Sequence, residues 1–384
     1  MNCMDIFKYS LPTKVVFGSD TINELPKLIK ENFPKKSSIL LVTGRSSLKK
    51  QGITDKFLKI LEKYTIVLFD KVEANPTSDI VYEGIETYKK HRCDLVIAVG
   101  GGSVMDAGKA IAILVNNQKP LEVYQSGEKP EHPSDDFIAI PTTSGTSSEM
   151  TVWSVITNKE GAYKNTKKSF SDEKMYPKLA VIDPKLTLGL SAYQTASTGL
   201  DVLSHAMEGF WSKKKNPISD LYALEAIKLV VKYLPTAYKN GSDLVAREKM
   251  SFATLLAGFA FSNSRTTSPH KVSYPLTTQY QLPHGAACAV TLPYFMHYIG
   301  KNDLDRLQPI LNIFGVSQAN EALNFLKTFI KDLDMPCTLK EVGVEEEDLD
   351  YIARKTYAPI EKQEDPVPLS FDDYLEVLKL AYGS

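Results

Sequence analysis

The chain of 384 residues carries 45 basic and 46 acidic side chains, and its net charge of -1 gives no electrostatic reason to expect nucleic acid or an acidic membrane surface as a partner. A chain of this length is too long for one ordinary core and predicts two or perhaps three domains, and its 43% of hydrophobic residues is typical of a soluble globular protein. No segment has the roughly 18 uninterrupted apolar residues of a membrane helix. The scattered cysteines and the absence of a secretion signal predict a cytoplasmic protein with reduced thiols.

Short apolar runs in the first half of the chain predict buried strands. They are continuous in Val, Ile and Leu rather than alternating, as in strands that are covered on both faces. Helical patterns at 53–64 and 78–91 lie between them. Alternating strands and helices predict an α/β domain with a doubly wound parallel sheet over residues 1–187. The predicted strands are 37–44, 65–70, 94–102, 136–143 and 178–184.

The strand pattern stops near residue 187, and the remaining chain has helical periodicity. We therefore expect an all-helical second domain over residues 188–384. The clearest helical patterns span residues 191–212, 218–234, 245–261 and 320–333.

A glycine-rich loop follows the third predicted strand, in AVGGGSVMDAGKAIA (98–112). Glycines there would let the backbone approach a phosphate at the start of a helix, although Met105 replaces the last glycine of the G-x-G-x-x-G fingerprint. The alternative is that Ser103 and Asp106 only form a capping box. A second turn, IPTTSGTSSEMT (140–151), is rich in hydroxyls and suits a dinucleotide, or else it is a polar loop with a capping box at Thr146 and Glu149.

The first predicted strand ends in LLVTGRSSLKKQG (40–52). An NAD site of the Rossmann type would place an acidic residue here to hold the ribose 2′-hydroxyl. The neutral and basic residues Gly44, Arg45 and Ser46 instead suit a 2′-phosphate, so we expect NADP(H) to be preferred over NAD(H). Solvated basic side chains are the alternative.

Asp201 and His205 are four residues apart in a predicted helix and therefore project from one face, as two ligands of one metal ion would. The alternative is a capping box of Thr198 and Asp201 beside a packing histidine. His270 and His284 would complete a set of one carboxylate and three imidazoles, which suits Fe²⁺, with Zn²⁺ also possible. Spacing alone does not establish that these residues converge.

Several segments together resemble the iron-containing (group III) alcohol dehydrogenases over essentially the full chain. The resemblance implies a dinucleotide domain followed by a helical metal domain, and the metal ligands Asp201, His205, His270 and His284. It also implies hydride transfer between NAD(P)H and a small aldehyde or alcohol, and a homo-oligomer such as a dimer. The matching segments are PTKVVFG (12–18), GGGSVMDAGKA (100–110), PTTSGTSSEMT (141–151), VIDPKLT (181–187), TGLDVLSHAMEG (198–209) and LPHGAACAVTLP (282–293).

The same resemblance assigns the cofactor residues. Gly101, Gly102 and Ser103 would hold the pyrophosphate with Asp106 close by, and Lys168 would approach the cofactor. Hydroxyls would line the adenosine side, from Thr142, Thr143, Thr146 and Thr151. Members of the family often have a histidine four residues after the third ligand, where this chain has Tyr274, which would hydrogen-bond a substrate oxygen or simply pack.

Arg265 and Lys271 flank the third ligand among several hydroxyls, and such groups suit an anionic substrate. SPHKVSYPLTTQYQLPHG (268–285) and EGFWSKKKNPISD (208–220) are similar to the phosphonoacetaldehyde reductase branch, so we expect reduction of phosphonoacetaldehyde to 2-hydroxyethylphosphonate. If the two charges are merely solvated, an uncharged aldehyde such as butanal or lactaldehyde is the alternative. A sugar-phosphate cyclase, whose metal set begins with a glutamate, and a non-catalytic protein with the same fold also stay open.

Overall fold

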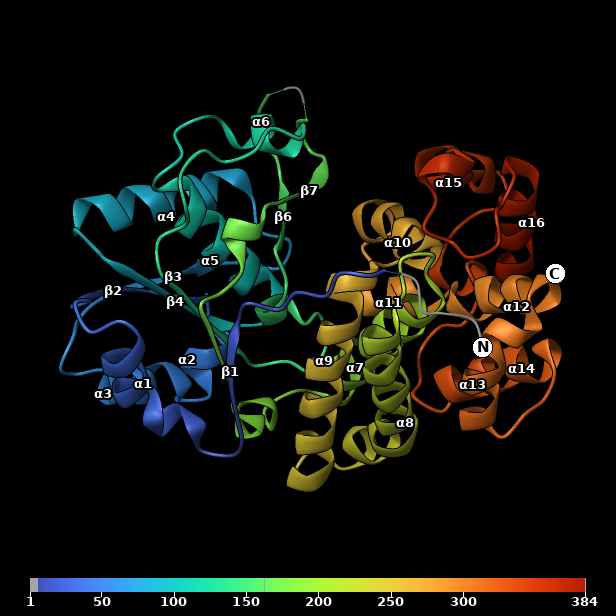
Figure 1. Cartoon of the computed structure of the whole chain (residues 1–384), viewed down its shortest axis with the longest axis horizontal. Coiled ribbons are helices and arrows are strands. Elements are labelled where there is room, and N and C mark those ends of the chain that lie inside the picture. Colours follow the sequence, from blue (N-terminus) through green and yellow to red (C-terminus); the bar gives the residue numbers. More distant parts are fainter. Residues whose placement is uncertain (1–5, 162, 384) are drawn as a thin grey trace. The chain divides into compact units, whose positions relative to one another are not determined.

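The computed structural model describes residues 6–161 and 163–383, which form two compact units (Figure 1). One unit comprises residues 12–189 and the other residues 190–383 together with 6–11. The N-terminal segment is held in the second unit because the Tyr9 hydroxyl donates to the Phe259 carbonyl at 3.0 Å and the Ser10 N–H donates to Asn263 Oδ1 at 2.9 Å. The α/β unit therefore begins at Pro12.

Six parallel strands form the main sheet of the α/β unit, in the order β1-β8-β5-β4-β2-β3. This confirms the predicted doubly wound sheet, including all five predicted strands, and adds β1 at its edge. The strands are β1 (Lys14–Phe17), β2 (Ser38–Gly44), β3 (Thr65–Val72), β4 (Leu95–Gly100), β5 (Phe137–Pro141) and β8 (Leu179–Ile182).

The apolar runs are continuous because both faces of the sheet are covered. Leu40 and Val42 of β2 belong to one core with residues of α4 and α5, while Ile39 and Leu41 belong to a second core with residues of α1 and α3. The helices of this unit are α1 (Leu25–Asn32), α2 (Ser47–Lys50), α3 (Ile53–Ile60), α4 (Ser78–Lys90), α5 (Gly102–Leu114) and α6 (Leu121–Gln125).

A small antiparallel hairpin, β6 (Trp153–Thr157) and β7 (Lys167–Ser171), is added to this unit and was not predicted. Short 3-10 turns complete the unit. They span Thr21–Glu24, Ser148–Met150, Glu173–Met175 and Pro184–Thr187.

The second unit is helical, as predicted, and its core surrounds α7, which includes the fully buried Trp211. Among the described residues, none of these or the other helices has both the length and the apolar character needed to cross a membrane. The helices are α7 (Ala192–Trp211), α8 (Pro217–Lys239), α9 (Leu244–Ser264), α10 (Ser268–Gln279), α11 (His284–Ala289), α12 (Leu292–Asn302), α13 (Leu304–Phe314), α14 (Ala319–Lys331), α15 (Asp348–Thr356) and α16 (Phe371–Tyr382).

Two glycines allow other helices to approach α7 closely. A Cβ atom added to Gly199 would lie 2.3 Å from Leu234 of α8, and one added to Gly285 of α11 would lie 1.9 Å from the carbonyl oxygen of Ser197. At Gly285 only glycine fits, because the added atom would meet backbone that cannot turn aside, and this contact brings the first turn of α11 onto the first half of α7.

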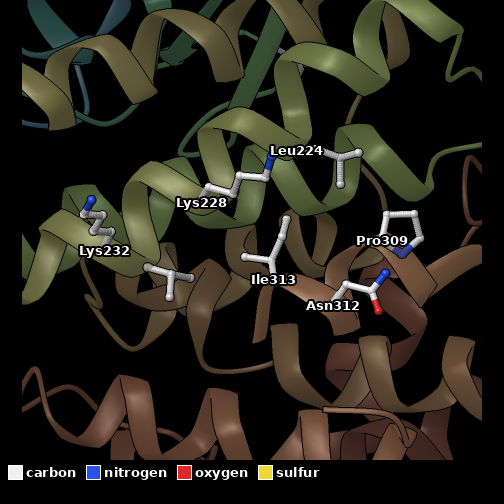
Figure 2. Close-up of a pocket in the computed structure, with 7 residues that line it drawn as sticks. Leu224, Lys228, Lys232, Pro309, Asn312 and Ile313 are labelled. Carbon is white, nitrogen blue, oxygen red and sulfur yellow. The ribbon is translucent and has the colours of Figure 1, made fainter. Parts of the chain in front are cut away.

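A cavity of about 490 Å³ lies between α8 and α13 (Figure 2). Leu224, Val231 and Ile313 give it an apolar lining, with Lys228 and Lys232 beside them. None of the residues that the sequence predicts for cofactor, metal or substrate lines this cavity.

Candidate functional site

The helix α7 places Asp201 and His205 one turn apart in its buried interior. Their exposed fractions are only 2% and 4%. The helix begins at Ala192 with a capping box of Ser191 and Gln194, so the alternative that Thr198 and Asp201 cap a helix is wrong. Both predicted ligands therefore project from a rigid, packed element.

Two further helices bring the remaining predicted histidines to Asp201. His270 lies in the first turn of α10, and His284 is the first residue of α11. Asp201 Oδ1 is 3.7 Å from Nδ1 of His205, 3.7 Å from Nε2 of His270 and 3.9 Å from Nε2 of His284. The imidazoles of His205 and His270 have centroids 4.4 Å apart, and those of His270 and His284 lie 5.5 Å apart. Residues from three helices thus converge on one carboxylate oxygen.

Glu208, which was not predicted as a site residue, contacts the ring nitrogen of His270 that faces away from Asp201. Its Oε1 lies 2.5 Å from Nδ1 of His270, and its Oε2 accepts hydrogen bonds from the backbone N–H and the hydroxyl of Thr267 at 2.7 and 3.1 Å. A carboxylate on the second ring nitrogen is the usual partner of a metal-binding histidine. The sequence spacing could have identified Glu208, because it follows His205 by three residues and therefore lies on the same face of the helix.

The electrostatics of the cluster fit a cation. His205 Nδ1 and His270 Nε2 are buried and have no hydrogen-bond partner among the described residues. Burial, together with the charges of His270 and His284, lowers the pKa of His205 well below its ordinary value, which leaves a neutral ring with a free lone pair. Burial opposes the charged form of His270, but Cys288 and the Glu208 carboxylate outweigh it and raise the pKa of His270. A divalent metal would satisfy the orphaned nitrogens and replace that proton.

A second unpredicted neighbour of the cluster is the thiol of Cys288. Its Sγ lies 4.0 Å from Nδ1 and 3.9 Å from Nε2 of His284. On the other side, the Ser273 hydroxyl donates to the His270 carbonyl at 2.7 Å and lies 3.4 Å from Nδ1 of His284. His284 is thus held between a hydroxyl and a thiol.

The predicted substrate residues lie in different environments. Arg265 is exposed at the end of α9, with φ at 67°, and Tyr274 is exposed on α10. The Nζ atom of Lys271, in contrast, is buried without a hydrogen-bond partner among the described residues. Burial raises the pKa of Asp365, and the charge of Lys271 opposes this, so the two side chains are electrostatic neighbours.

The glycine loop of the α/β unit packs closely against the second predicted loop at the start of α5. Gly101 is the N-cap of α5 and makes no side-chain cap hydrogen bond, so the capping box of Ser103 and Asp106 does not form. A Cβ atom on Gly102 would lie 2.7 Å from Thr146, and one on Gly101 would lie 3.4 Å from Thr143. Glycine thus lets the two predicted loops pack together beside a helix N-terminus whose N–H groups suit a pyrophosphate.

Asp106 connects the two loops. Its Oδ1 accepts from the Ser148 hydroxyl at 2.6 Å, and its Oδ2 accepts from the backbone N–H of Val155 at 3.0 Å. The contacts of Asp106 in the structure thus position the second loop, and its place near a pyrophosphate stays a prediction.

Thr142 and Thr151 are buried in the same turn, and the Thr151 hydroxyl accepts a hydrogen bond from Lys109 Nζ at 3.3 Å. Both carboxylate oxygens of Glu149 lack a hydrogen-bond partner among the described residues, so the capping box with Thr146 does not form.

The sheet topology places the β2 loop beside the glycine loop. From β2 the chain continues outward to β3, and from β4 it continues to the other side toward β5, so the strand order reverses between β2 and β4. Dinucleotides bind at such a switch point, outside the carboxyl ends of the strands. Strand β2 ends at Gly44 and is followed by Arg45 and Ser46. The Arg45 side chain forms an exposed ion pair with Glu73.

The predicted cofactor residue Lys168 lies in the β6–β7 hairpin, with its Nζ 3.5 Å from the centre of the Tyr163 ring.

Known proteins match this chain along nearly its whole length. The model of the iron-containing alcohol dehydrogenases matches residues 12–184, and that of the C-terminal part of the same family matches residues 195–382. The NAD-dependent methanol dehydrogenase of Bacillus methanolicus is 31% identical over 383 residues, 97% of this chain and 99% of the relative. The 1,3-propanediol dehydrogenase of Citrobacter freundii is 34% identical over 91% of this chain and 92% of the relative.

Among solved structures, the sulfoacetaldehyde reductase from Bifidobacterium kashiwanohense in complex with NAD⁺ superposes with a TM-score of 0.91 and 32% identity, over 99% of this chain and 100% of that one. The chain belongs to the iron-containing alcohol dehydrogenase family. It is an NAD(P)-dependent oxidoreductase of this class, so we set aside the sugar-phosphate cyclase and the non-catalytic protein.

Proposed function

We propose that this chain is a metal-dependent aldehyde reductase whose ion is held by Asp201, His205, His270 and His284. The observation that carries the proposal is their convergence on Asp201 Oδ1, with separations of 3.7 to 3.9 Å and two orphaned imidazole nitrogens. One carboxylate and three imidazoles suit Fe²⁺ and also Zn²⁺. When bound, the ion supplies Lewis acidity to a substrate oxygen and NAD(P)H supplies the hydride.

The chain's own residues prepare the site. Asp201 contributes the negative charge, and Glu208 holds His270 in the tautomer that leaves Nε2 free. The ring of Phe261 stacks on His205 with centroids 4.1 Å apart and excludes water from that side.

In the α/β unit, Gly101, Gly102 and Ser103 offer an uncapped helix N-terminus to the pyrophosphate. The adjoining turn is lined by Thr142, Thr143, Thr146 and Thr151.

For the substrate we propose a two-carbon aldehyde with an anionic head group, and phosphonoacetaldehyde in particular, which would give 2-hydroxyethylphosphonate. Lys271 supports this choice, because its Nζ atom is buried, has no hydrogen-bond partner among the described residues, and would gain one from a phosphonate oxygen that reaches it. It follows the predicted ligand His270 in α10, so its side chain leaves the helix about 100° away from that of His270 and lies near Asp365. The sulfoacetaldehyde reductase named above is, by its name, a reductase of an anionic aldehyde as well. Arg265 is exposed, so we expect it to attract the anionic substrate from the surface of the site rather than to bind it inside.

The test compares anionic and neutral substrates in one protein. The Fe²⁺-loaded enzyme is assayed for NADPH oxidation with phosphonoacetaldehyde and with butanal. Lys271→Met should raise KM for phosphonoacetaldehyde about tenfold or more and leave KM for butanal nearly unchanged, because a hydrogen bond to a charged group contributes about 1.5–3 kcal/mol. Lys228→Met, on the surface of α8, is the control. Equal losses for both substrates would show that Lys271 serves only Asp365, and preference for butanal would support the uncharged alternative.

We further propose that NADP(H) is preferred over NAD(H). The β2 loop offers Gly44, Arg45 and Ser46 at the position where an acidic residue would hold a ribose 2′-hydroxyl. Arg45 is engaged with Glu73, but its side chain is 61% exposed, and surface ion pairs contribute only about 0–1 kcal/mol. A 2′-phosphate can therefore draw the guanidinium away at little cost.

A further inference from the structure

Cys288 lies one helical turn after His284 on α11, so both side chains project from the same face of that helix. The residue is fully buried, and its Sγ lies 3.9 Å from the Nε2 atom of His284 that faces Asp201. The thiol therefore lies beside the predicted metal ligands and within the same helical unit.

The separations suit a shared ion. Asp201, His270, His284 and Cys288 each offer one donor atom, and all four atoms lie within 4.8 Å of one another. With metal–sulfur and metal–nitrogen bonds of about 2.3 and 2.0 Å, neighbouring donors around a five-coordinate ion lie about 2.8–3.6 Å apart. The observed 3.7 Å between Asp201 and His270 and 3.9 Å between His284 and Cys288 therefore require an inward movement of roughly half an ångström to one ångström.

The surroundings of the thiol are those of a ligand rather than of a packing residue. A cysteine that only fills space is surrounded by apolar atoms, whereas Cys288 has imidazole and carboxylate groups as neighbours. Independently, His270 Nε2 is buried and lacks a hydrogen-bond partner among the residues described, which indicates that a cation belongs at this point.

We propose that Cys288 is an additional ligand of the metal centre, so that the donor set of this chain is one carboxylate, three imidazoles and one thiolate. On binding, the S–H bond breaks, a metal–sulfur bond forms and the proton leaves to water. Because thiolate is a soft donor, it increases the affinity for Zn²⁺ relative to a purely oxygen and nitrogen set. This inference rests on the proposed metal site.

The test uses Co²⁺ added to the metal-free full-length protein, with its absorption as the readout. Visible ligand-field bands report entry of Co²⁺ into the site, and a near-ultraviolet sulfur-to-cobalt charge-transfer band reports a thiolate ligand. Wild type is compared with Cys288→Ser and with Cys288→Ala, which fits among the small residues of α11. Cys337→Ser is the control, because this buried cysteine of the same unit lies outside the donor cluster.

We expect both types of band in wild type and in Cys337→Ser. Both Cys288 variants should keep the visible bands, lose the near-ultraviolet band and bind Zn²⁺ about tenfold or more weakly. Visible bands without a charge-transfer band in wild type, or a charge-transfer band that persists in Cys288→Ser, would overturn the assignment of Cys288 while leaving the metal centre intact. The absence of visible bands from wild type would overturn the metal centre itself.

Discussion

Glu208 Oε1 lies 2.5 Å from Nδ1 of His270, and the other carboxylate oxygen, Oε2, accepts a hydrogen bond from the backbone N–H of Thr267 at 2.7 Å. One buried carboxylate therefore caps α10 and turns the imidazole of His270 so that its Nε2 faces Asp201. The start of α10 and the orientation of a proposed metal ligand thus depend on the same residue of α7.

Replacing Glu208 should weaken metal binding. We expect Glu208→Ala to lower the affinity for Fe²⁺ or Zn²⁺ about 10- to 100-fold, as is usual when the partner of a metal-binding histidine is removed. Glu208→Gln should lose less, because the amide oxygen still accepts one hydrogen bond. Competition with a chromophoric chelator measures the affinity, with the exposed Glu225→Gln as control. Unchanged affinity with lower stability would show that Glu208 only caps the helix.

Gly285→Ala should disrupt the convergence on Asp201. The added Cβ would lie 1.9 Å from the Ser197 carbonyl oxygen, so α11 would have to move away from α7 and take His284 with it. We expect loss of metal binding and a lower thermal midpoint. Gly44→Ala is the control, since a Cβ there meets Val72 O at an ordinary 3.5 Å. Full metal content in Gly285→Ala would contradict the predicted role of this contact.

Gly44→Asp should shift the cofactor preference toward NADH. The new carboxylate would repel a 2′-phosphate and accept a hydrogen bond from a 2′-hydroxyl, and a Cβ atom at Gly44 meets its neighbours only at 3.5 Å or more. We expect the ratio of kcat/KM for NADPH to that for NADH to fall by about tenfold or more. Gly44→Ala, which adds bulk without charge, should leave the ratio unchanged. The same ratio in Gly44→Asp as in wild type would contradict the assignment of this loop.

Glu149 should make the stability of the α/β unit depend on pH. Burial raises its pKa from 4.5 to about 7, although the charge of Lys109 opposes this. The folded state therefore holds the proton more tightly than the unfolded chain, and the free energy of unfolding should fall, on the order of 3 kcal/mol, between about pH 4.5 and 7. Urea unfolding at about pH 5 and pH 8, followed by Trp153 fluorescence in a Trp211→Phe background, should show this fall in the parent and with the exposed Glu86→Gln, but not with Glu149→Gln.

The main elements follow from local sequence. The buried strands were predictable because burial on both faces requires continuous apolar runs, and the helices because their apolar positions recur with helical period. The β6–β7 hairpin was not, since Lys167–Ser171 is polar and the hairpin depends on distant contacts such as that of Asp106 with Val155 N–H. Tertiary packing decides such elements, and a short sequence window does not contain it.

Two capping motifs in the sequence predicted helix starts that the structure does not have, for a related physical reason. Ser103 with Asp106 and Thr198 with Asp201 have the right spacing, but the helices begin at Gly102 and Ala192. A capping pattern marks a helix start only where the chain also leaves the helical conformation, and spacing does not show that. The same limit applies to Cys288, whose relation to His284 is visible in spacing but whose approach to Asp201 requires the packing of α11 on α7.

The most direct test of the central claim compares wild type with His270→Ala and His284→Ala, by metal content and by NADPH oxidation with an aldehyde. The control is His297→Ala, because His297 is buried on α12 outside the cluster. We expect about one Fe²⁺ or Zn²⁺ per chain and steady NADPH oxidation in wild type and the control, and the loss of both in the two ligand variants. Full metal content and full turnover in either ligand variant would contradict the account.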